Sequence, residues 1–274
     1  MTDQEKIKSY YSQFDEWARL DTAEGRLEFD ILLNLIEQYL PKGCTVLDLG
    51  GGPGRYTAAL SLRGYDMHLA DLSPDLIETA KIKLKEHGDP AFIKSISVAD
   101  ALDLKRYGSE SFDAVLLLGP LYHLTSASEI QTCLTEVCRV LRSGGILIAA
   151  YIPRLSGIRS VLARALYQSG QADADTLHEL VETGRFRNKS SEGFQEGYFL
   201  KTEMLESLMS EAGLRKLAVR SVRGIGNGME ATILTAQEKD HQLYTCIIDM
   251  IRSTAADPAV IDSSGHAVYI GSKD

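Results

Sequence analysis

A glycine-rich turn early in the chain is the segment whose residue types most directly indicate chemistry. The run is Val46-Leu47-Asp48-Leu49-Gly50-Gly51-Gly52-Pro53-Gly54-Arg55, in which a strand-like apolar segment leads into glycines and then into a helix. Glycines at such a turn let the backbone approach a ligand where any Cβ would clash. The sequence therefore predicts a ligand-binding turn, whose contacting glycines are Gly50, Gly51, Gly52 and Gly54.

Two phosphate-binding interpretations of this turn do not fit. A dinucleotide fingerprint that begins at Gly50 needs glycine at position 55, where Arg55 stands, and no Gly-Lys-Ser/Thr follows to form a Walker A loop. Asp48 is a further discriminator, because a carboxylate two residues before the turn repels a pyrophosphate and attracts an ammonium group. We therefore expect a ligand that is cationic near this turn and carries no phosphates there.

Two further acids are expected at the ends of neighbouring strands. Asp71 ends the second predicted strand, where a carboxylate can accept hydrogen bonds from both hydroxyls of a ribose. Asp100 ends the third, where it can accept from an exocyclic amino group such as that of adenine. Each acid alone could be a helix cap. Together with Asp48 they converge on the crevice where open parallel sheets bind ligands.

The elements that position these acids alternate between strand and helix. Alternation of this kind implies crossover connections and a parallel sheet that is buried on both faces. Ser73 and Pro74 mark a helix start, and Ser143-Gly144-Gly145 is expected to end a helix through a left-handed cap. The predicted strands cover 45–49, 66–70, 92–98, 112–118 and 146–151, and the helices between them cover 55–63, 74–87 and 126–142.

The segments outside this core are mainly helical. Apolar spacing predicts an aromatic-rich helix over 7–18 and a second helix over 27–39 that ends before Pro41. Residues 153–200 interrupt the alternation with two or three helices and loops. The alternation returns with a helix over 202–212, a strand over 214–222, a helix over 240–252 and a strand over 267–270.

On these motifs the chain resembles a class I S-adenosylmethionine-dependent methyltransferase of the small-molecule type. The resemblance covers the turn at Val46–Gly54, Asp71-Leu72-Ser73-Pro74, Asp100-Ala101 and the strand segment Phe112–Gly119. It implies one doubly wound, Rossmann-like α/β domain over 1–274, with a seven-stranded, mostly parallel sheet and an antiparallel last strand. Within it we expect an N-terminal helical lid (1–42), a cofactor-binding core (43–152), a helical insert that shapes the acceptor pocket (153–200) and a C-terminal part of the sheet (201–274).

The same resemblance implies S-adenosyl-L-methionine as cofactor and a role for each site residue. Asp48 and the glycines would face the methionyl part, Asp71 with Leu72 the ribose, and Asp100 with Ala101 the adenine. Tyr122 and His123, which follow the fourth strand, would lie beside the sulfonium as candidate catalytic residues, Tyr122 through its π face and His123 as a proton acceptor. The remaining expected cofactor contacts are Leu118, Gly119, Tyr11 and Arg19, the last through the methionyl carboxylate.

Composition and charge limit the classes of methyl acceptor that we expect. The 274 residues are 44% hydrophobic and 24% charged, as in globular proteins, and the net charge of -9 disfavours a nucleic-acid partner. No signal peptide, apolar span or metal-binding cysteine pair is evident, so we expect a cytoplasmic enzyme, monomer or homodimer, that uses no metal or membrane and methylates a small molecule.

Two alternatives stay open, an RNA or protein methyltransferase and a non-catalytic S-adenosylmethionine-binding module. Between Arg154 and Lys189 six basic side chains stand against four acidic ones, which favours an anionic acceptor.

Overall fold

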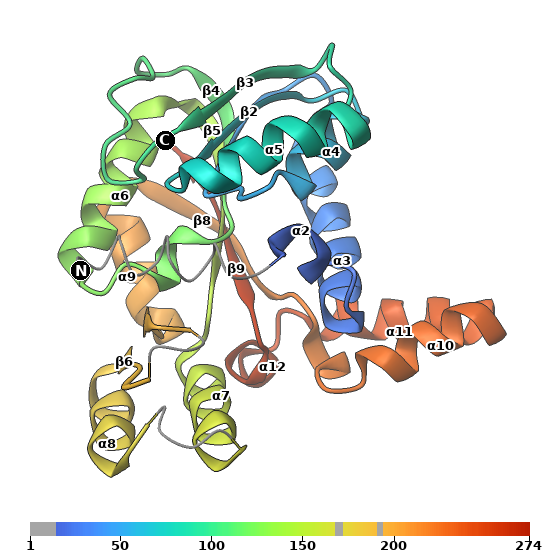
Figure 1. Cartoon of the computed structure of the whole chain (residues 1–274), viewed down its shortest axis with the longest axis vertical. Helices are drawn as coiled ribbons and strands as arrows, with labels where there is room; N and C mark the ends of the chain where they lie inside the picture. Colours follow the sequence, from blue (N-terminus) through green and yellow to red (C-terminus); the bar gives the residue numbers. More distant parts are fainter. Residues whose placement is uncertain (1–14, 168–171, 191–193) are drawn as a thin grey trace.

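Seven strands form one twisted sheet in the computed structural model, which describes residues 15–167, 172–190 and 194–274 (Figure 1). Their order is β3-β2-β1-β4-β5-β9-β8, and β9 runs antiparallel to both of its neighbours. The predicted seven-stranded sheet with an antiparallel last strand is therefore confirmed. The strands are β1 (Thr45–Leu49), β2 (Asp66–Asp71), β3 (Ile93–Val98), β4 (Phe112–Leu117), β5 (Leu141–Tyr151), β8 (Leu214–Ser221) and β9 (Ala267–Lys273).

The central strands have apolar sequences because helices cover both of their faces. In β1 and β4 almost every side chain is buried, as expected for parallel strands between two helical layers. Asp48 of β1 pairs in register with Leu69 of β2 and Leu116 of β4. The carboxyl ends of these three strands consequently lie together at one edge of the sheet, where Asp48 is the last residue but one of β1 and Asp71 ends β2.

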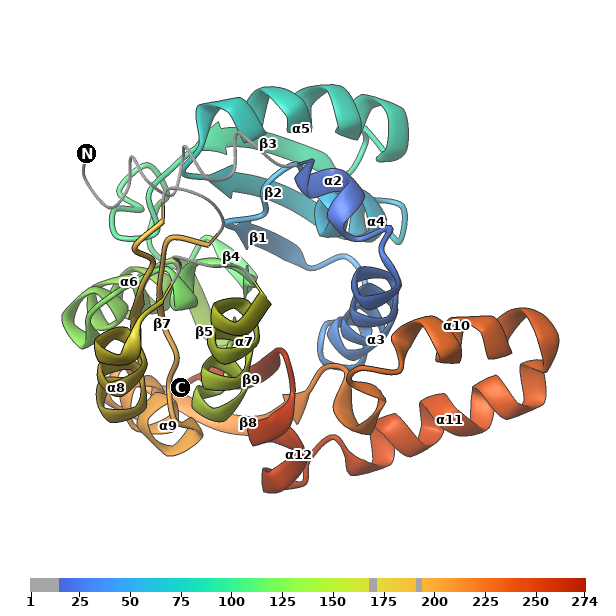
Figure 2. The same ribbon diagram turned by 60° about the horizontal axis from the view of Figure 1, so that its bottom comes forward.

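Helices cover the two faces in the alternating manner of a doubly wound fold. Helices α3, α4, α10 and α11 pack on one face of the central strands, α5 joins α4 beside β2, and α6 and α9 pack on the other face. In Figure 2 the α10–α11 hairpin projects away from the sheet. These helices are α3 (Ala23–Tyr39), α4 (Arg55–Ser61), α5 (Pro74–His87), α6 (Ala127–Val140), α9 (Thr202–Glu211), α10 (Glu230–Lys239) and α11 (His241–Thr254).

Local capping explains where these helices begin. The Ser73 side chain accepts a hydrogen bond from the Leu76 amide at the start of α5, as its sequence predicts. Helix α3 starts earlier than predicted, at Ala23, because Thr22 caps it. Helix α6 begins with a capping box between Ser126 and Glu129.

The predicted end of the helix over 126–142 is wrong. Helix α6 ends at Val140, and Leu141 is already extended and paired with Phe112 in the sheet. Gly144 does have a positive φ of 75°, but it lies within β5 and caps no helix. Pairing with β4 takes up the residues that were expected to form the last helical turn.

Several short elements were not predicted. Helix α10 starts without a side-chain cap, and α12 (Pro258–Ser263) is a short helix before β9. Two 3₁₀ turns, η1 (Pro120–Tyr122) and η2 (Gly224–Gly226), follow β4 and β8. The segment 153–200 contains the expected helices and also a two-stranded sheet. Its elements are α7 (Arg154–Tyr167), α8 (Ala174–Thr183), β6 (Arg185–Arg187) and β7 (Glu196–Tyr198).

Helix α2 (Glu16–Arg19) begins after its N-cap Asp15, which is not helical, so the prediction of one helix over 7–18 is wrong at residue 15. Residues 7–14 of that prediction lie outside the described residues. Trp17 stacks on His87 of α5 with ring centroids 4.9 Å apart, and the Arg55 guanidinium lies 4.9 Å from the Trp17 ring. These contacts hold α2 over α4 and α5. Across the described residues, no helix is both long and apolar enough to cross a membrane.

Replacing Gly25 with Ala tests how closely α2 is joined to α3. A Cβ at Gly25 would lie 2.3 Å from the Arg19 carbonyl oxygen and 2.6 Å from the Leu20 Cα. Alanine adds up to about 1 kcal/mol of helix propensity, but this backbone clash costs more, so we expect a net loss of stability in urea unfolding. The exposed Arg26→Ala variant is the control. A Gly25→Ala protein as stable as the wild type would contradict the close contact.

Candidate active site

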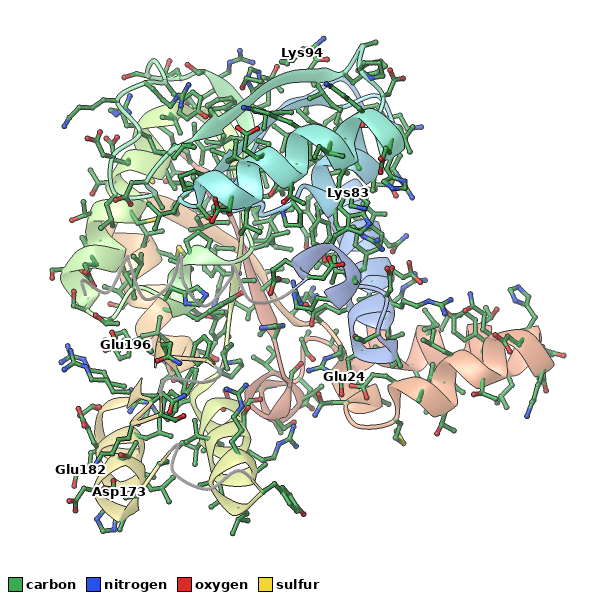
Figure 3. The ribbon with its side chains drawn as sticks, in the orientation of Figure 1. Glu24, Lys83, Lys94, Asp173, Glu182 and Glu196 are labelled. Atoms are coloured by element: carbon green, nitrogen blue, oxygen red, sulfur yellow. The ribbon has the colours of Figure 1, made fainter. Side chains whose placement is uncertain are left out.

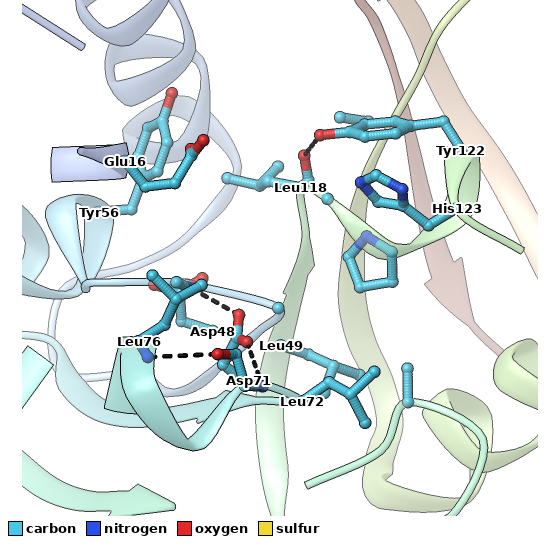
Figure 4. A pocket seen from close by; sticks show the side chains of 18 of the residues that line it. Glu16, Asp48, Leu49, Tyr56, Asp71, Leu72, Leu76, Leu118, Tyr122 and His123 are labelled. Atoms are coloured by element: carbon cyan, nitrogen blue, oxygen red, sulfur yellow. Dashed lines mark hydrogen bonds between the residues drawn. The ribbon is translucent and has the colours of Figure 1, made fainter. Parts of the chain in front are cut away.

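One pocket lies at the carboxyl ends of β1, β2 and β4. Residues of α2, α3 and η1 form the rest of its wall. It gathers nearly all of the predicted site residues that the structure describes (Figure 4). Tyr11 lies outside the described residues, and Gly54 does not line the pocket. The predicted residues that do line it are Arg19, Asp48, Gly50, Gly51, Gly52, Asp71, Leu72, Asp100, Ala101, Leu118, Gly119, Tyr122 and His123.

The glycine turn has the backbone shape that its composition predicts. Gly50, Gly52 and Gly54 have positive φ angles of 72°, 55° and 90°. A Cβ at Gly51 would lie 2.7 Å from the Asp48 carboxylate, whereas a Cβ at Gly52 would meet only Leu76 at 4.0 Å and would fill the pocket. Gly52 is therefore the glycine whose missing side chain leaves room for a ligand, while Gly54 serves as the left-handed N-cap of α4.

Asp48 lies beneath the turn with 1% of its surface exposed. Its Oδ2 accepts a hydrogen bond of 2.7 Å from the Thr57 hydroxyl of α4. Burial raises the pKa of the Asp48 carboxyl to about 6, although the hydrogen bond from Thr57 opposes the rise. A buried carboxylate of this kind gains from a cationic partner in the pocket, which agrees with the predicted ammonium group.

Asp71 joins the tip of β2 to the glycine turn. Its Oδ2 accepts from the Gly52 amide and its Oδ1 from the Ser73 amide, each at 2.8 Å. Burial raises the pKa of the Asp71 carboxyl, and these two backbone hydrogen bonds oppose the rise. Figure 4 shows the carboxylates of Asp48 and Asp71 close to one another beneath the pocket. The lone pairs of Asp71 that these amides do not use remain for hydroxyl groups of a ligand.

Asp100 follows β3 at the same edge of the sheet. Its Oδ1 accepts a hydrogen bond of 2.9 Å from the Leu102 amide, which folds the chain so that Ala101 also lines the pocket. Leu118 and Gly119 line it from the end of β4. The three predicted strand-end acids are thus brought to one site.

Arg19 reaches the pocket from α2. Its Nε donates a hydrogen bond of 2.9 Å to Glu16, which also lines the pocket. Arg55, the other guanidinium of the lining, pairs with Asp21 at 2.9 Å and lies over Trp17. Arg19 therefore forms an ion pair on its own helix and also lines the pocket.

Tyr122 and His123 lie at the opposite side of the pocket, after β4. The Tyr122 hydroxyl donates to the Leu118 carbonyl at 3.5 Å, and the Tyr122 ring stacks 5.7 Å from His266. Burial lowers the pKa of His123 to about 4, so its ring is uncharged at neutral pH and is a weak base. Proton acceptance by His123 stays a prediction.

Glu28, Tyr56 and His266 are among the pocket residues that the sequence did not indicate. Glu28 lies on α3, Tyr56 on the first turn of α4, and His266 immediately before β9. The Glu28 Oε2 and the His266 Nδ1 are 2.9 Å apart although 238 positions separate these residues. Tyr56 follows the glycine turn directly, and this position was the one local signal available for any of them.

The insert packs beside the site without lining the pocket. None of the described residues in 153–200 belongs to the lining, but Phe194 lies 5.4 Å from the His123 ring. The basic side chains of the insert make contacts of their own: Arg154 donates to the Thr183 carbonyl, Lys189 pairs with Asp173, and Arg164 lies over Phe194. Figure 3 shows Asp173 and Glu182 on α8, away from the sheet.

Comparison with known proteins relates the chain to methyltransferases. Residues 47–149 match the family model described as a methyltransferase domain. The chain is 29% identical over 222 residues to a glycine/sarcosine N-methyltransferase of Parasynechococcus marenigrum, covering 77% of each chain. It is 25% identical to a ubiquinone/menaquinone biosynthesis C-methyltransferase of Idiomarina loihiensis, covering 67% of this chain and 71% of that one.

The fold is shared with solved structures of low identity. A magnesium protoporphyrin IX methyltransferase from Synechocystis, solved with bound S-adenosylhomocysteine, superposes with a TM-score of 0.62 at 13% identity and full coverage of both chains. An S-adenosylmethionine-dependent methyltransferase from Methanosarcina mazei has a TM-score of 0.60 at 18% identity, covering 87% of this chain and 96% of that one.

Replacing Asp71 with Ala is expected to weaken S-adenosylmethionine binding by about 1.5–3 kcal/mol, the usual contribution of hydrogen bonds to a charged group. Titration calorimetry measures the change as a roughly ten- to hundredfold higher Kd. Asp71→Asn keeps one acceptor for the turn, and Asp75→Ala, on the exposed start of α5, is the control. Unchanged affinity in Asp71→Ala would remove Asp71 from the cofactor site.

Replacing Asp48 with Asn separates stability from binding. Because burial raises the pKa of Asp48 to about 6, its contribution to stability is present below about pH 4 and is lost as pH rises through 6. We expect Asp48→Asn to be more stable than the wild type at pH 7, by up to about 3 kcal/mol, and to bind S-adenosylmethionine more weakly. Thermal unfolding and calorimetry from pH 4 to 8 measure both effects.

The wild-type affinity for S-adenosylmethionine should fall as the pH drops below about 6, because Asp48 then becomes neutral. Asp48→Asn should lose that pH dependence, whereas the exposed Asp75→Asn should keep it. A wild-type affinity that stays constant across this range would show that Asp48 does not pair with the ammonium group.

Proposed function

Since this chain is a class I S-adenosylmethionine-dependent methyltransferase, we propose that its methyl acceptor is a small molecule that enters the cofactor pocket itself. One observation carries this proposal: the lining of a single pocket runs from Asp48 and Asp71 at the strand ends to Glu28 and His266 at the opposite wall. An acceptor must reach this interior to meet the methyl group. A small molecule can enter such a space whole.

Charge and the named relatives support the same conclusion. The net charge of -9 is the wrong sign for a broad nucleic-acid surface. The names of the related proteins refer to glycine and sarcosine, to ubiquinone and menaquinone, and to magnesium protoporphyrin, all of which are small molecules. For this chain we propose the same class of methyl acceptor, a small molecule, but none of these particular compounds.

In this proposal the cofactor-side residues bind and orient. S-adenosylmethionine supplies an activated methyl group on a positively charged sulfur. Asp48 provides the negative charge for its ammonium group, Asp71 accepts from its ribose hydroxyls, and Asp100 accepts from its adenine amino group. The Arg19 guanidinium provides the positive charge for its carboxylate.

The remaining elements align the acceptor and exclude water. Tyr122 and His123 border the place where the acceptor lies, and α2 covers the cofactor side of the pocket. The insert 153–200 supports η1 through the contact of Phe194 with His123. Because the reaction is a direct displacement, alignment in an enclosed pocket supplies much of the rate acceleration.

A methyl-transfer screen tests the proposal. The purified chain is incubated with S-adenosylmethionine labelled in its methyl group and, separately, with a low-molecular-weight metabolite pool, total RNA and a protein extract. We expect label only in products of the metabolite pool, and loss of that label in the Asp71→Ala variant. Label in RNA or protein would establish the alternative acceptor class, and no label in any pool with normal cofactor binding would indicate a non-catalytic binding module.

A further inference from the structure

Two polar atoms of the pocket lining have no hydrogen-bond partner in the described part of the chain. The Glu28 carboxylate uses Oε2 for its hydrogen bond to His266, and its Oε1 makes no hydrogen bond to any described residue. The Tyr56 hydroxyl likewise makes no hydrogen bond to a described residue, and Tyr56 lines the same pocket. Both groups are therefore available to a bound molecule.

These two groups lie close enough to act on one ligand. Glu28 and Tyr56 both line this pocket, and Phe29, which follows Glu28 on α3, packs on the Tyr56 ring with the ring centroids 5.0 Å apart. Figure 4 shows Tyr56 beside Glu16 at one side of Leu118, with Tyr122 and His123 at the other side. Helices α3 and α4 thus present both groups to the same pocket.

Glu28 is held in its ionised form. Burial alone would raise the pKa of its carboxyl, but the charge and hydrogen bond of His266, together with Arg19 and Arg223, lower the pKa to about 2. The Arg223 guanidinium lies 3.8 Å from Glu28 and also donates to Glu230 at 2.8 Å, so one guanidinium is shared by two carboxylates. A negative charge with an open oxygen consequently faces the pocket.

The Tyr56 hydroxyl stays protonated beside that charge. Burial, followed by the nearby negative charge of Glu28, raises the pKa of Tyr56 well above its usual value. Its oxygen can accept a hydrogen bond from the ligand. A carboxylate and a hydroxyl oxygen together form two acceptors, which match a group that has two N–H bonds.

These two hydrogen-bond acceptors favour some methyl-accepting nucleophiles over others. A methyl acceptor that reacts as an oxyanion would be repelled by the Glu28 carboxylate if its oxygen lay against Oε1. An amine nitrogen that donates its two N–H bonds to Glu28 and Tyr56 keeps its lone pair free for attack. The basic residues of the insert, on which an anionic acceptor was expected, make their described contacts outside the pocket.

We propose, on the basis of the proposed function, that the methyl acceptor is a primary amine whose nitrogen is bound by Glu28 and Tyr56, and that the product is N-methylated. The neutral amine uses its lone pair to form the N–C bond while the C–S bond breaks and its electrons remain on sulfur. The positive charge passes from sulfur to nitrogen, where Glu28 stabilises it. The new ammonium then loses a proton to water.

Fractionation of the metabolite pool tests the acceptor class. The pool is separated into cation-exchange-retained, anion-exchange-retained and unretained fractions, and labelled products are identified by mass spectrometry. We expect label in the cationic fraction, in products that carry an N-methyl group. Label confined to O-, S- or C-methylated products would overturn the amine assignment while leaving the proposed function intact. The absence of label from every fraction would count against both.

Two variants test the residues. Glu28→Gln should lower kcat/KM for the labelled amine by about ten- to a hundredfold, with the Kd for S-adenosylmethionine unchanged in calorimetry. Tyr56→Phe removes a hydroxyl without a described partner, so it should fold normally and lower kcat/KM by about five- to tenfold. Glu24→Gln, an exposed position of the same helix α3 labelled in Figure 3, is the matched control.

A binding readout separates recognition from chemistry. In the presence of S-adenosylhomocysteine, the amine should raise the thermal unfolding temperature of the wild-type protein and of Glu24→Gln, and should raise it less in Glu28→Gln and Tyr56→Phe. If Tyr56→Phe matched the wild type in both kcat/KM and stabilisation, the amine site would be refuted even where Glu28→Gln failed to fold.

Discussion

The hydrogen bond from the Gly52 amide to Asp71 joins the turn after β1 to the tip of β2, and the shape of the pocket depends on it. The amide can reach the carboxylate because Gly52 adopts a positive φ, and no side chain then occupies the space above it. The second oxygen of Asp71 accepts from Ser73, which caps α5. One carboxylate therefore sets the relative positions of a strand end, a glycine turn and a helix start.

Beneath this junction the protein keeps a buried acid whose charged form costs stability. Asp48 has little exposure and is tied to Thr57, and burial raises its pKa towards neutrality. Packing alone does not explain a carboxylate at this position, because an amide of the same shape would also accept the hydrogen bond from Thr57. A ligand with positive charge near the glycine turn explains why a carboxylate is useful there.

The part of the pocket lining around Glu28 and His266 is organised by a chain of polar contacts between distant segments. Glu28 of α3 contacts His266 before β9 and Arg223 after β8, and Arg223 contacts Glu230 at the start of α10. His266 in turn stacks on Tyr122 of η1. This part of the lining thus connects helices on one face of the sheet to the loop that borders the reacting end, and it fixes the charge of Glu28 without using its second oxygen.

The sequence by itself determined the parallel sheet, the glycine turn and the three strand-end acids, because each depends on local patterns: buried apolar runs, glycine spacing, and acids directly after strands. It did not place Glu28 opposite His266, and it misplaced the end of α6, where pairing of Leu141 with Phe112 overrides the expected glycine cap. Only the tertiary structure decided that Glu28, Tyr56 and His266 line one pocket. They come from α3, α4 and the residue before β9, and no periodicity or spacing within one segment reports a contact made across 238 positions of chain.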